Sequence, residues 1–540
     1  MPAAPATATA EQRTAALAAR LRDAALARGE ADVQLLQTHI SWLLLAGDMA
    51  YKLKKPLTLD FLDFGTLAQR HAACLQELRL NRRTAPGLYL DVQPITGSWQ
   101  APAIGGPIGD AGPPLEWAVR MRRFPATALM AGMAARGELA APHIDALARA
   151  IAAFQAQAAV ADADSPWGQP ASLARLADDN FSTLFGLQGP PDLPKQLQNL
   201  QQWTHTQGQR LMPLMAARRA QGQVREGHGD LHLGNLLWLH GQPVLFDAIE
   251  FNPALRWLDT ACDLAFLFMD LHAHGLAPLA WRLLNAWLER TGDFGAVPRL
   301  PWDAVYRALV RAKVAALQAR QGADENARQT ARQQALRYVQ LTTRLAAPRR
   351  PWLALTHGVS GAGKSSQSQG LIEQQGLVRV RADVERKRLY GLPPEARSAH
   401  VPGGIYGEDA SDRTFARLLD VARLCLQAGQ PVLVDATFLH AARRAPFIAL
   451  ARELGAPWCI LSFSAPEAVL RERVRQRQAR GGDASEAGEA VLDSQLAHRD
   501  PLTPEEQAHT LALDTTAPVH WPAAWPRLSS LPGMPPPETV

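Results

Sequence analysis

The glycine-rich segment from Gly358 to Ser365 constrains the fold of this chain more than any other feature. It reads Gly-Val-Ser-Gly-Ala-Gly-Lys-Ser, with an apolar run before it and a helical pattern after it. Glycines let successive backbone N–H groups turn toward one anion, and the N-terminus of the next helix adds positive potential. Lys364 is then placed to reach the β- and γ-phosphates of a nucleoside triphosphate, and Ser365 to hold magnesium. The residues expected to contact the nucleotide are Gly358, Ser360, Gly361, Ala362, Gly363, Lys364, Ser365 and Ser366.

Strand and helix patterns alternate after residue 352. Strands are predicted at 352–357, 377–381, 431–434 and 458–463, and helices at 364–375, 412–427, 441–454 and from 466 onward. This alternation indicates a parallel sheet with helices on both faces. The last stretch, 521–540, is rich in proline and is expected to be a tail without fixed structure.

Charged residues near the ends of these strands provide candidates for the chemistry of a kinase. Asp383 is predicted to take the proton of an acceptor hydroxyl, Arg386 to hold an anionic group of the acceptor, and Asp435 to hold magnesium or orient the acceptor. Each carboxylate alone could equally cap a helix or face solvent, but together they favour a site. Arg473 and Arg477 share one helix face and are expected to close over the phosphates.

A second motif lies more than a hundred positions earlier. It runs from His228 to Asn235 as His-Gly-Asp-Leu-His-Leu-Gly-Asn, and Phe246-Asp247 follows it. The spacing of Asp230 and Asn235 fits a carboxylate that receives a hydroxyl proton and an amide that holds magnesium. Asp247 is expected to be the second magnesium ligand, because hard cations prefer oxygen atoms. His232 is interpreted as a residue that orients the loop.

The sequence around this motif predicts a small lobe with a sheet, followed by helices. A hairpin is expected from residues 40–45 and 49–55, a helix at 66–83, and a strand pair near 89–95 and 117–124. The predicted organisation is a helical arm (1–34), a kinase domain (35–345, with its small lobe to about 125), a linker (346–351), a P-loop domain (352–520) and the tail (521–540).

The segment 228–235 with Phe246-Asp247 resembles the aminoglycoside phosphotransferase and choline kinase superfamily, whose fold is that of protein kinases. The resemblance covers roughly residues 35 to 340 and implies that Lys52 contacts the α- and β-phosphates of ATP, with Glu77 as its ion-pair partner. Lys54 remains an alternative to Lys52, because both lysines share one face of the strand. One departure is that the turn before Lys52 offers only Gly47, where such kinases usually have a glycine-rich loop.

The second half, over roughly 352 to 515, resembles P-loop kinases of the polynucleotide 5′-hydroxyl kinase, gluconate kinase and zeta-toxin group. The segments 381–386 and 434–437 carry this resemblance. The predicted fold class is therefore α/β and α+β, with a two-lobed protein-kinase-like domain followed by a P-loop domain that has a parallel sheet between helices.

The predicted function is that of a bifunctional phosphotransferase that uses ATP and magnesium and acts on small-molecule hydroxyl acceptors. The alternative is an ATP-binding protein whose N-terminal kinase is a degenerate scaffold and whose C-terminal half is active, with 5′-hydroxyl ends of nucleic acids as one candidate acceptor. Nucleic acid is the less favoured partner, because basic and aromatic residues do not interleave as in single-strand binders.

Composition bounds the class of protein. Hydrophobic residues make up 47% and charged residues 20%, which is typical of globular domains, and no apolar stretch is long enough to cross a bilayer. We therefore expect a cytoplasmic protein without a membrane partner. The net charge of +5 favours anionic ligands only weakly, and the four cysteines are too dispersed for a zinc site, so we expect reduced, buried thiols.

Overall fold

The computed structural model describes residues 9–59, 62–105, 113–322, 324–401, 404–481 and 483–536. The chain forms two compact units. The first comprises Met1–Leu139, Ala153–Asp270 and Tyr306–Gln340, and the second Ala140–Ala152, Leu271–Val305 and Leu341–Val540. The segment 271–305 thus groups with the glycine-rich loop, although its sequence falls within the predicted kinase domain. The beginning of the predicted helical arm and the end of the predicted tail lie outside the described residues.

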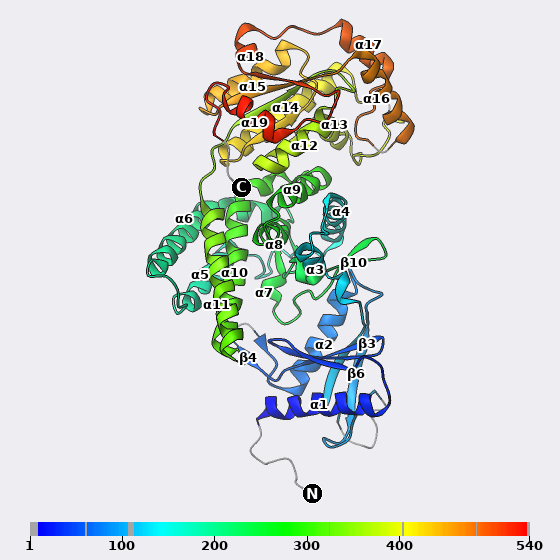
Figure 1. Ribbon diagram of the computed structural model, residues 1–540, viewed down its shortest axis with the longest axis vertical. Helices are drawn as coiled ribbons and strands as arrows, with labels where there is room; N and C mark the ends of the chain where they lie inside the picture. The colour runs from blue at the N-terminus through cyan, green and yellow to red at the C-terminus, as the bar shows by residue number, and fades with distance from the viewer. Residues whose placement is uncertain are drawn as a thin grey trace. The chain divides into compact units, whose positions relative to one another are not determined.

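The first unit contains an antiparallel sheet of six strands in the order β1-β2-β3-β8-β6-β7. Figure 1 labels β3 and β6 of this sheet. Its strands are β1 (Gln34–Gln37), β2 (Ser41–Ala46), β3 (Met49–Lys54), β6 (Tyr89–Gly97), β7 (Pro102–Ile104) and β8 (Glu116–Arg122). The predicted hairpin is confirmed, since β2 and β3 pair from Ser41 opposite Lys54 to Ala46 opposite Met49. The helices α1 (Ala10–Ala27) and α2 (Leu67–Asn81) pack against this sheet. Thr66 caps α2 through a reciprocal side-chain pair with Gln69, which explains where the helix begins.

The rest of the first unit is mainly helical, as the sequence predicts. Two short antiparallel strand pairs interrupt the helices: β9 (Val224–Glu226) pairs with β12 (Trp257–Asp259), and β10 (Leu236–Leu239) pairs with β11 (Gln242–Leu245). Leu236 pairs with Leu245, so β10 and β11 bring the segment 228–235 and Asp247 together at the open end of one hairpin. The larger helices are α5 (Pro170–Leu184), α6 (Leu193–Ala220), α8 (Thr260–Ala273), α10 (Leu300–Gln321) and α11 (Glu325–Ala346), and α4 (Ala141–Gln157), α8, α10 and α11 each contribute residues to both units.

The second unit is built on a parallel sheet of five strands in the order β14-β15-β13-β16-β17. Its strands are β13 (Leu353–His357), β14 (Val378–Arg381), β15 (Val432–Asp435), β16 (Trp458–Ser464) and β17 (Thr510–Asp514). The helices are α9 (Ala277–Thr291), α12 (Lys364–Gln375), α13 (Ala382–Leu389), α14 (Glu408–Gln427), α15 (Ala441–Glu453), α16 (Glu467–Arg480), α17 (Glu489–Ala497), α18 (Pro504–Ala508) and α19 (Trp521–Ser529). All adjacent strands of this sheet pair in parallel, so the predicted fold class is confirmed.

The prediction of an unstructured tail from residue 521 is wrong for its first part. Residues Trp521–Ser529 form the helix α19, and Trp521, Trp525 and Leu528 are buried in the same apolar core as Trp352. The three side chains recur at helical spacing, and Pro522 falls at the start of the helix, where its missing N–H costs nothing. Proline content therefore misled the prediction because it outweighed the apolar periodicity. Residues 537–540 lie outside the described chain.

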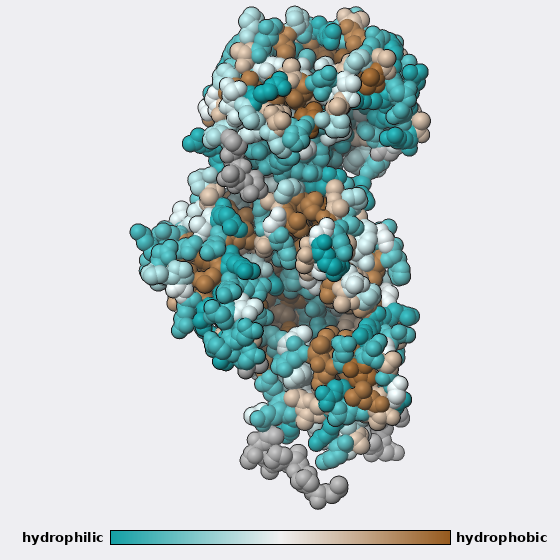
Figure 2. Space-filling view, in the orientation of Figure 1, coloured by the Kyte–Doolittle hydropathy of each residue, from teal (hydrophilic) through white to brown (hydrophobic). Residues whose placement is uncertain are grey.

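On the face that Figure 2 shows, most of the surface is hydrophilic and apolar residues gather in small groups. No helix among the described residues is long and apolar enough to span a membrane. All four cysteines are free thiols in buried positions, as predicted.

Candidate active sites

The glycine-rich loop joins β13 to α12 and has the backbone conformation that its glycines permit. Gly361 and Gly363 both have left-handed φ angles, 82° and 79°. A side chain on Gly361 would bring its Cβ within 2.7 Å of the carbonyl oxygen of Leu470. The ammonium group of Lys364 lies inside the loop and donates to the carbonyl oxygens of Gly358 (2.9 Å) and Val359 (3.0 Å). The loop therefore closes around the ammonium group of Lys364.

A cavity of about 450 Å³ opens in front of this loop. Of the residues predicted to contact the nucleotide, Ser360, Gly361, Gly363, Lys364, Ser365 and Ser366 line the cavity. Gly358 and Ala362 do not line it. Ala362 is completely buried, and a Cβ on Gly358 would lie 2.5 Å from the carbonyl oxygen of Phe463, so these two residues support the loop from behind.

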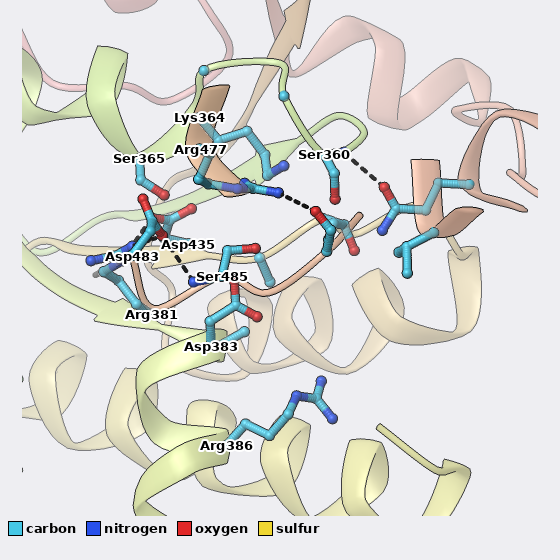
Figure 3. Close-up of a pocket in the computed structure, with 18 of the residues that line it drawn as sticks. Ser360, Lys364, Ser365, Arg381, Asp383, Arg386, Asp435, Arg477, Asp483 and Ser485 are labelled. Atoms are coloured by element: carbon cyan, nitrogen blue, oxygen red, sulfur yellow. Dashed lines mark hydrogen bonds and ion pairs between the residues drawn. The ribbon is translucent and has the colours of Figure 1, made fainter. Parts of the chain in front are cut away.

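Asp435 ends β15 at the floor of the cavity and lies beside Ser365 in Figure 3. Its Oδ1 atom is 3.4 Å from the hydroxyl of Thr356, while its Oδ2 atom is buried without a hydrogen-bond partner. A buried carboxylate oxygen of this kind normally has a partner, and a hard cation with its waters would supply one. The hydroxyl of Ser365 and the carboxylate of Asp435 therefore fit the requirements of a magnesium ion that also contacts phosphates.

Asp383 and Arg386 lie on α13 and line the other side of the cavity (Figure 3). The guanidinium of Arg386 donates to the carbonyl of Ile405 (3.1 Å) and the hydroxyl of Ser411 (3.2 Å), and it stacks on the ring of Tyr406. Its Nε atom is buried and has no hydrogen-bond partner. The site thus offers a carboxylate and a fixed cation one helical turn apart, on the side opposite the phosphate loop.

Arg473 and Arg477 extend from α16 to the same cavity, as predicted. Arg473 donates to the carbonyl and hydroxyl of Thr515 (2.6 and 3.0 Å) and lies 3.4 Å from the carbonyl of Gly361. Arg477 donates to the carbonyl of Ala487 (2.7 Å). Both guanidinium groups are therefore fixed by backbone oxygens at the edge of the phosphate loop.

The structure adds residues that the sequence did not single out. Arg381 lines the cavity, with its Nε atom 3.7 Å from Asp435 and its Nη2 atom 3.9 Å from Asp483. Gln495 of α17 accepts a hydrogen bond from the backbone N–H of Ser360 (2.7 Å). Arg381 is the last residue of β14, as Asp435 is of β15. Its position at the end of a predicted strand could therefore have marked it as a site residue. Gln495 gave no such signal, because a loop and a helix far along the chain bring it to the site.

The second candidate site lies in the first unit, around Asp230. The amide nitrogen of Asn235 donates to the carboxylate (2.9 Å) and to the carbonyl (3.0 Å) of Asp230, so the two predicted residues are in contact. This leaves the amide oxygen of Asn235 as its ligand atom. Asp263 accepts the N–H groups of His228 and Gly229 and so holds the loop in place. His232 accepts the N–H of Gly234 (3.0 Å), in keeping with its predicted orienting role.

Lysine, glutamate and aspartate side chains meet beside this loop. The ammonium of Lys52 lies 2.9 Å from Glu77 and 2.5 Å from Asp247. Lys54, the alternative, also binds Glu77, through its other carboxylate oxygen, and pairs with Glu250. Lys54 is completely buried, whereas Lys52 is 12% exposed and contacts a predicted magnesium ligand. Asp247 has a left-handed φ of 62°, a conformation that costs a non-glycine residue energy and that often occurs at functional sites.

The charge on Asp230 is stabilised by its neighbours. Burial alone would raise the pKa of this carboxyl group, but His232, Arg311 and His228 hold it below its ordinary value. The Nε2 atom of His232 lies 3.4 Å from Asp230 and 3.3 Å from the guanidinium of Arg311. Asp230 is therefore ionised at neutral pH and can accept a hydrogen bond from a hydroxyl group.

Comparison with known proteins agrees with both resemblances. A family model described as an AAA domain matches residues 353–502. Uncharacterized protein Rv2004c of Mycobacterium tuberculosis is 29% identical over 469 residues, which cover 87% of this chain and 91% of the relative. Similarity to this relative therefore covers most of both proteins.

Solved structures match each part separately. A sugar kinase from Janibacter sp. HTCC2649 is 21% identical over 34% of this chain and 96% of its own, with a TM-score of 0.27. A choline/ethanolamine kinase family protein from Mesorhizobium loti is 12% identical over 62% of this chain and 99% of its own, with a TM-score of 0.34. One of these two matches is a sugar kinase and the other a choline/ethanolamine kinase family protein, and the family model matches the segment that contains the glycine-rich loop.

Proposed function

We propose that this protein is a bifunctional phosphotransferase that moves the γ-phosphoryl group of ATP to hydroxyl acceptors at two separate sites. The observation that supports this proposal most strongly is that both sites contain the same kinds of side chain. Each site combines a lysine, a pair of oxygen ligands suited to magnesium, and a further carboxylate. These are Lys364, Ser365, Asp435 and Asp383 at one site, and Lys52, Asn235, Asp247 and Asp230 at the other. Bound magnesium would neutralise the charge that develops on the phosphate oxygens.

At the P-loop site, Lys364 and the backbone N–H groups of the loop bind and orient the β- and γ-phosphates. Asp383 accepts the proton of the acceptor hydroxyl, whose oxygen forms a bond to the γ-phosphorus while the bond from phosphorus to the bridging oxygen of ADP breaks. Arg386 has a buried Nε atom free for a polar or anionic group of the acceptor. Arg473 and Arg477 border the phosphate side and exclude water from it.

At the kinase-like site, Asp230 has the corresponding role as proton acceptor, and Asn235 fixes its carboxylate. Lys52 binds the α- and β-phosphates, while Glu77 keeps the lysine in place. The chemical step is the same exchange of one phosphorus–oxygen bond for another, and its rate depends on positioning and charge stabilisation rather than on a covalent intermediate.

The test is ADP release by the full chain and by three variants, Asp230→Asn, Lys364→Ala and the double variant, against panels of sugars, aminoglycosides, nucleosides and 5′-hydroxyl oligonucleotides. We expect each single variant to lose the acceptors of one site only and the double variant to lose all of them. Full phosphoryl transfer by the double variant would refute both assignments. Tight binding of Mg·ATP by the Lys364→Ala variant without turnover on any acceptor would favour the scaffold alternative for the N-terminal half.

A further inference from the structure

The helix α9 completes the edge of the parallel sheet in the second unit. β14 is an edge strand, so its outer backbone groups lack a neighbouring strand. The buried side chain of Asn285 takes the place of one: it accepts the N–H of Arg379 (2.6 Å) and donates to the carbonyl of Leu377 (2.8 Å). Trp281 packs over Gly376, where an added Cβ would lie 2.5 Å from the indole ring. α9 is therefore fixed to β14 by specific contacts, although it precedes the matched segment 353–502 in the chain.

Glu289 lies one helical turn after Asn285, on the same face of α9. One of its carboxylate oxygens lies 2.6 Å from a guanidinium nitrogen of Arg379, and the other lies 3.3 Å from Arg381. All three side chains are largely withdrawn from solvent. Burial would raise the pKa of Glu289, but the two arginines lower it, so the carboxylate remains charged.

The two arginines connect this carboxylate to both magnesium-type ligands of the P-loop site. Arg379 also donates to the carbonyl oxygen of Ser365 (3.2 Å), and Arg381 lies 3.7 Å from the carboxylate of Asp435. Figure 3 shows Arg381 beside Asp435 and Ser365. Glu289 is thus linked to Ser365 through Arg379 and to Asp435 through Arg381.

The charges explain why this connection matters for a cation. Without Glu289, the carboxylates closest to the guanidinium of Arg381 would be those of Asp435, at 3.7 Å, and Asp483, at 3.9 Å. A guanidinium that binds Asp435 competes with a metal ion for the same oxygen atoms. Glu289 attracts Arg381 and so weakens its pairing with Asp435. Glu289 also holds Arg379 against the start of α12. Both effects leave Ser365 and Asp435 able to bind a metal ion.

We propose that Glu289 is a positioning residue for the magnesium ion of the P-loop site, and that α9 is a functional part of that kinase. This inference rests on the proposed function, because it presumes a Mg·nucleotide complex at this site. Outer-shell partners of metal ligands commonly contribute about 10- to 100-fold to metal affinity. The P-loop kinase would therefore not be complete if the chain were cut at residues 346–351.

The test is Mn²⁺ binding in the presence of ADP, measured by electron paramagnetic resonance on the full chain. All proteins carry Asp247→Ala, which removes the predicted metal carboxylate of the other site. The variant is Glu289→Gln. The matched control is Glu373→Gln. Glu373 pairs with Arg282 of α9 at 2.8 Å and is about as exposed as Glu289. It contacts neither Arg379 nor Arg381.

We expect Glu289→Gln to weaken Mn²⁺ binding about 10-fold or more and to leave ADP binding without a divalent cation unchanged. We expect Glu373→Gln to bind Mn²⁺ as the parent does. Unchanged Mn²⁺ binding by Glu289→Gln would overturn the inference alone, and so would an equal loss in both variants. If the parent binds no Mn²⁺ with ADP, the proposed function of this site fails as well.

A conservative variant separates positioning from folding. Glu289→Asp keeps the charge but shortens the side chain, so it cannot contact both arginines in the same way. We expect it to fold like the parent in thermal unfolding and to bind Mn²⁺ with intermediate affinity. Parent-like affinity in Glu289→Asp together with an unfolded Glu289→Gln would show that the residue serves stability only, and would also overturn the inference.

Discussion

The ammonium nitrogen of Lys52 lies 2.5 Å from a carboxylate oxygen of Asp247, although 195 positions separate the two residues. The same nitrogen also contacts Glu77. Lys52 therefore lies between its expected ion-pair partner and an expected magnesium ligand, which is where a lysine that binds phosphates would be useful. Lys54 also contacts Glu77, but its second partner is Glu250, and its side chain has no exposed surface.

This difference predicts distinct consequences for the two lysines. Lys52→Met should weaken ATP binding at the kinase-like site and leave the fold intact, because Glu77 keeps Lys54 as a partner. Lys54→Met should instead destabilise the first unit by about 3–5 kcal/mol, since it removes the lysine that pairs with the buried carboxylate of Glu250. ATP titration and thermal unfolding in the Lys364→Ala background measure both effects. Loss of ATP binding without loss of stability in Lys54→Met would reverse the assignment.

The pKa of Glu77 predicts how acid affects the first unit. Burial alone would raise this pKa, but Lys52 and Lys54 lower it from 4.5 to about 2. A carboxyl group with a depressed pKa stabilises the fold fully above its unfolded value and loses that contribution as the pH falls. Glu77→Gln should therefore be less stable than the parent near neutral pH, and the gap should narrow as the pH falls from 4.5 toward 2. Urea unfolding of both proteins across this range is the measurement, and a gap independent of pH would contradict the charge argument.

Two glycines of the phosphate loop should differ in their tolerance of alanine. Both have left-handed φ angles, which cost an alanine roughly 1–2 kcal/mol. A Cβ on Gly361 would also lie 2.7 Å from a backbone carbonyl, whereas the nearest atom to a Cβ on Gly363 is 3.3 Å away on the flexible side chain of Gln367. Gly361→Ala should thus reduce ADP affinity more than Gly363→Ala. Equal affinities in calorimetric titration would show that the loop relaxes around the added atom.

Local sequence patterns were sufficient for most elements and for the contacts within each motif. The glycine-rich loop, the helix that begins at Lys364 and the contact between Asp230 and Asn235 each depend on neighbouring residues, so spacing alone predicted them. Glu289 and Gln495 could not be found in this way. Their roles depend on the packing of helices that are distant in the chain, and a single glutamate or glutamine in a helix gives no sign of its partner.

The C-terminal helix α19 leads to a prediction about truncation. Trp525 is buried against Trp352, and Trp521 donates to the carbonyl of Gln367 in the helix that follows the phosphate loop. Trp525→Ala should cost about 3–5 kcal/mol in the free energy of unfolding of the second unit. Removal of residues 521–540 should cost more. A truncated chain that unfolds at the same denaturant concentration as the parent would show that α19 is dispensable.

The neighbours of Asp230 predict the pH dependence of the kinase-like site. His232, Arg311 and His228 hold the pKa of Asp230 below its ordinary value in spite of burial. Since the ionised carboxylate accepts the hydroxyl proton, turnover should rise with pH through this pKa and be level near neutral pH. Arg311→Met removes one of the stabilising cations and should move the rising limb to higher pH.

Steady ATP hydrolysis by the Lys364→Ala protein, followed from neutral pH down to the lowest pH at which the protein stays folded, tests this prediction without knowledge of the acceptor. The control is Arg307→Met in the same helix, because Arg307 stacks on Phe266 and donates to the backbone of Cys262 rather than lying beside Asp230. Its activity should depend on pH as that of the Lys364→Ala parent does. A parent-like profile in Arg311→Met would mean that the other neighbours of Asp230 are enough to keep it ionised, whereas a shift in both variants would point to a change in packing around α10.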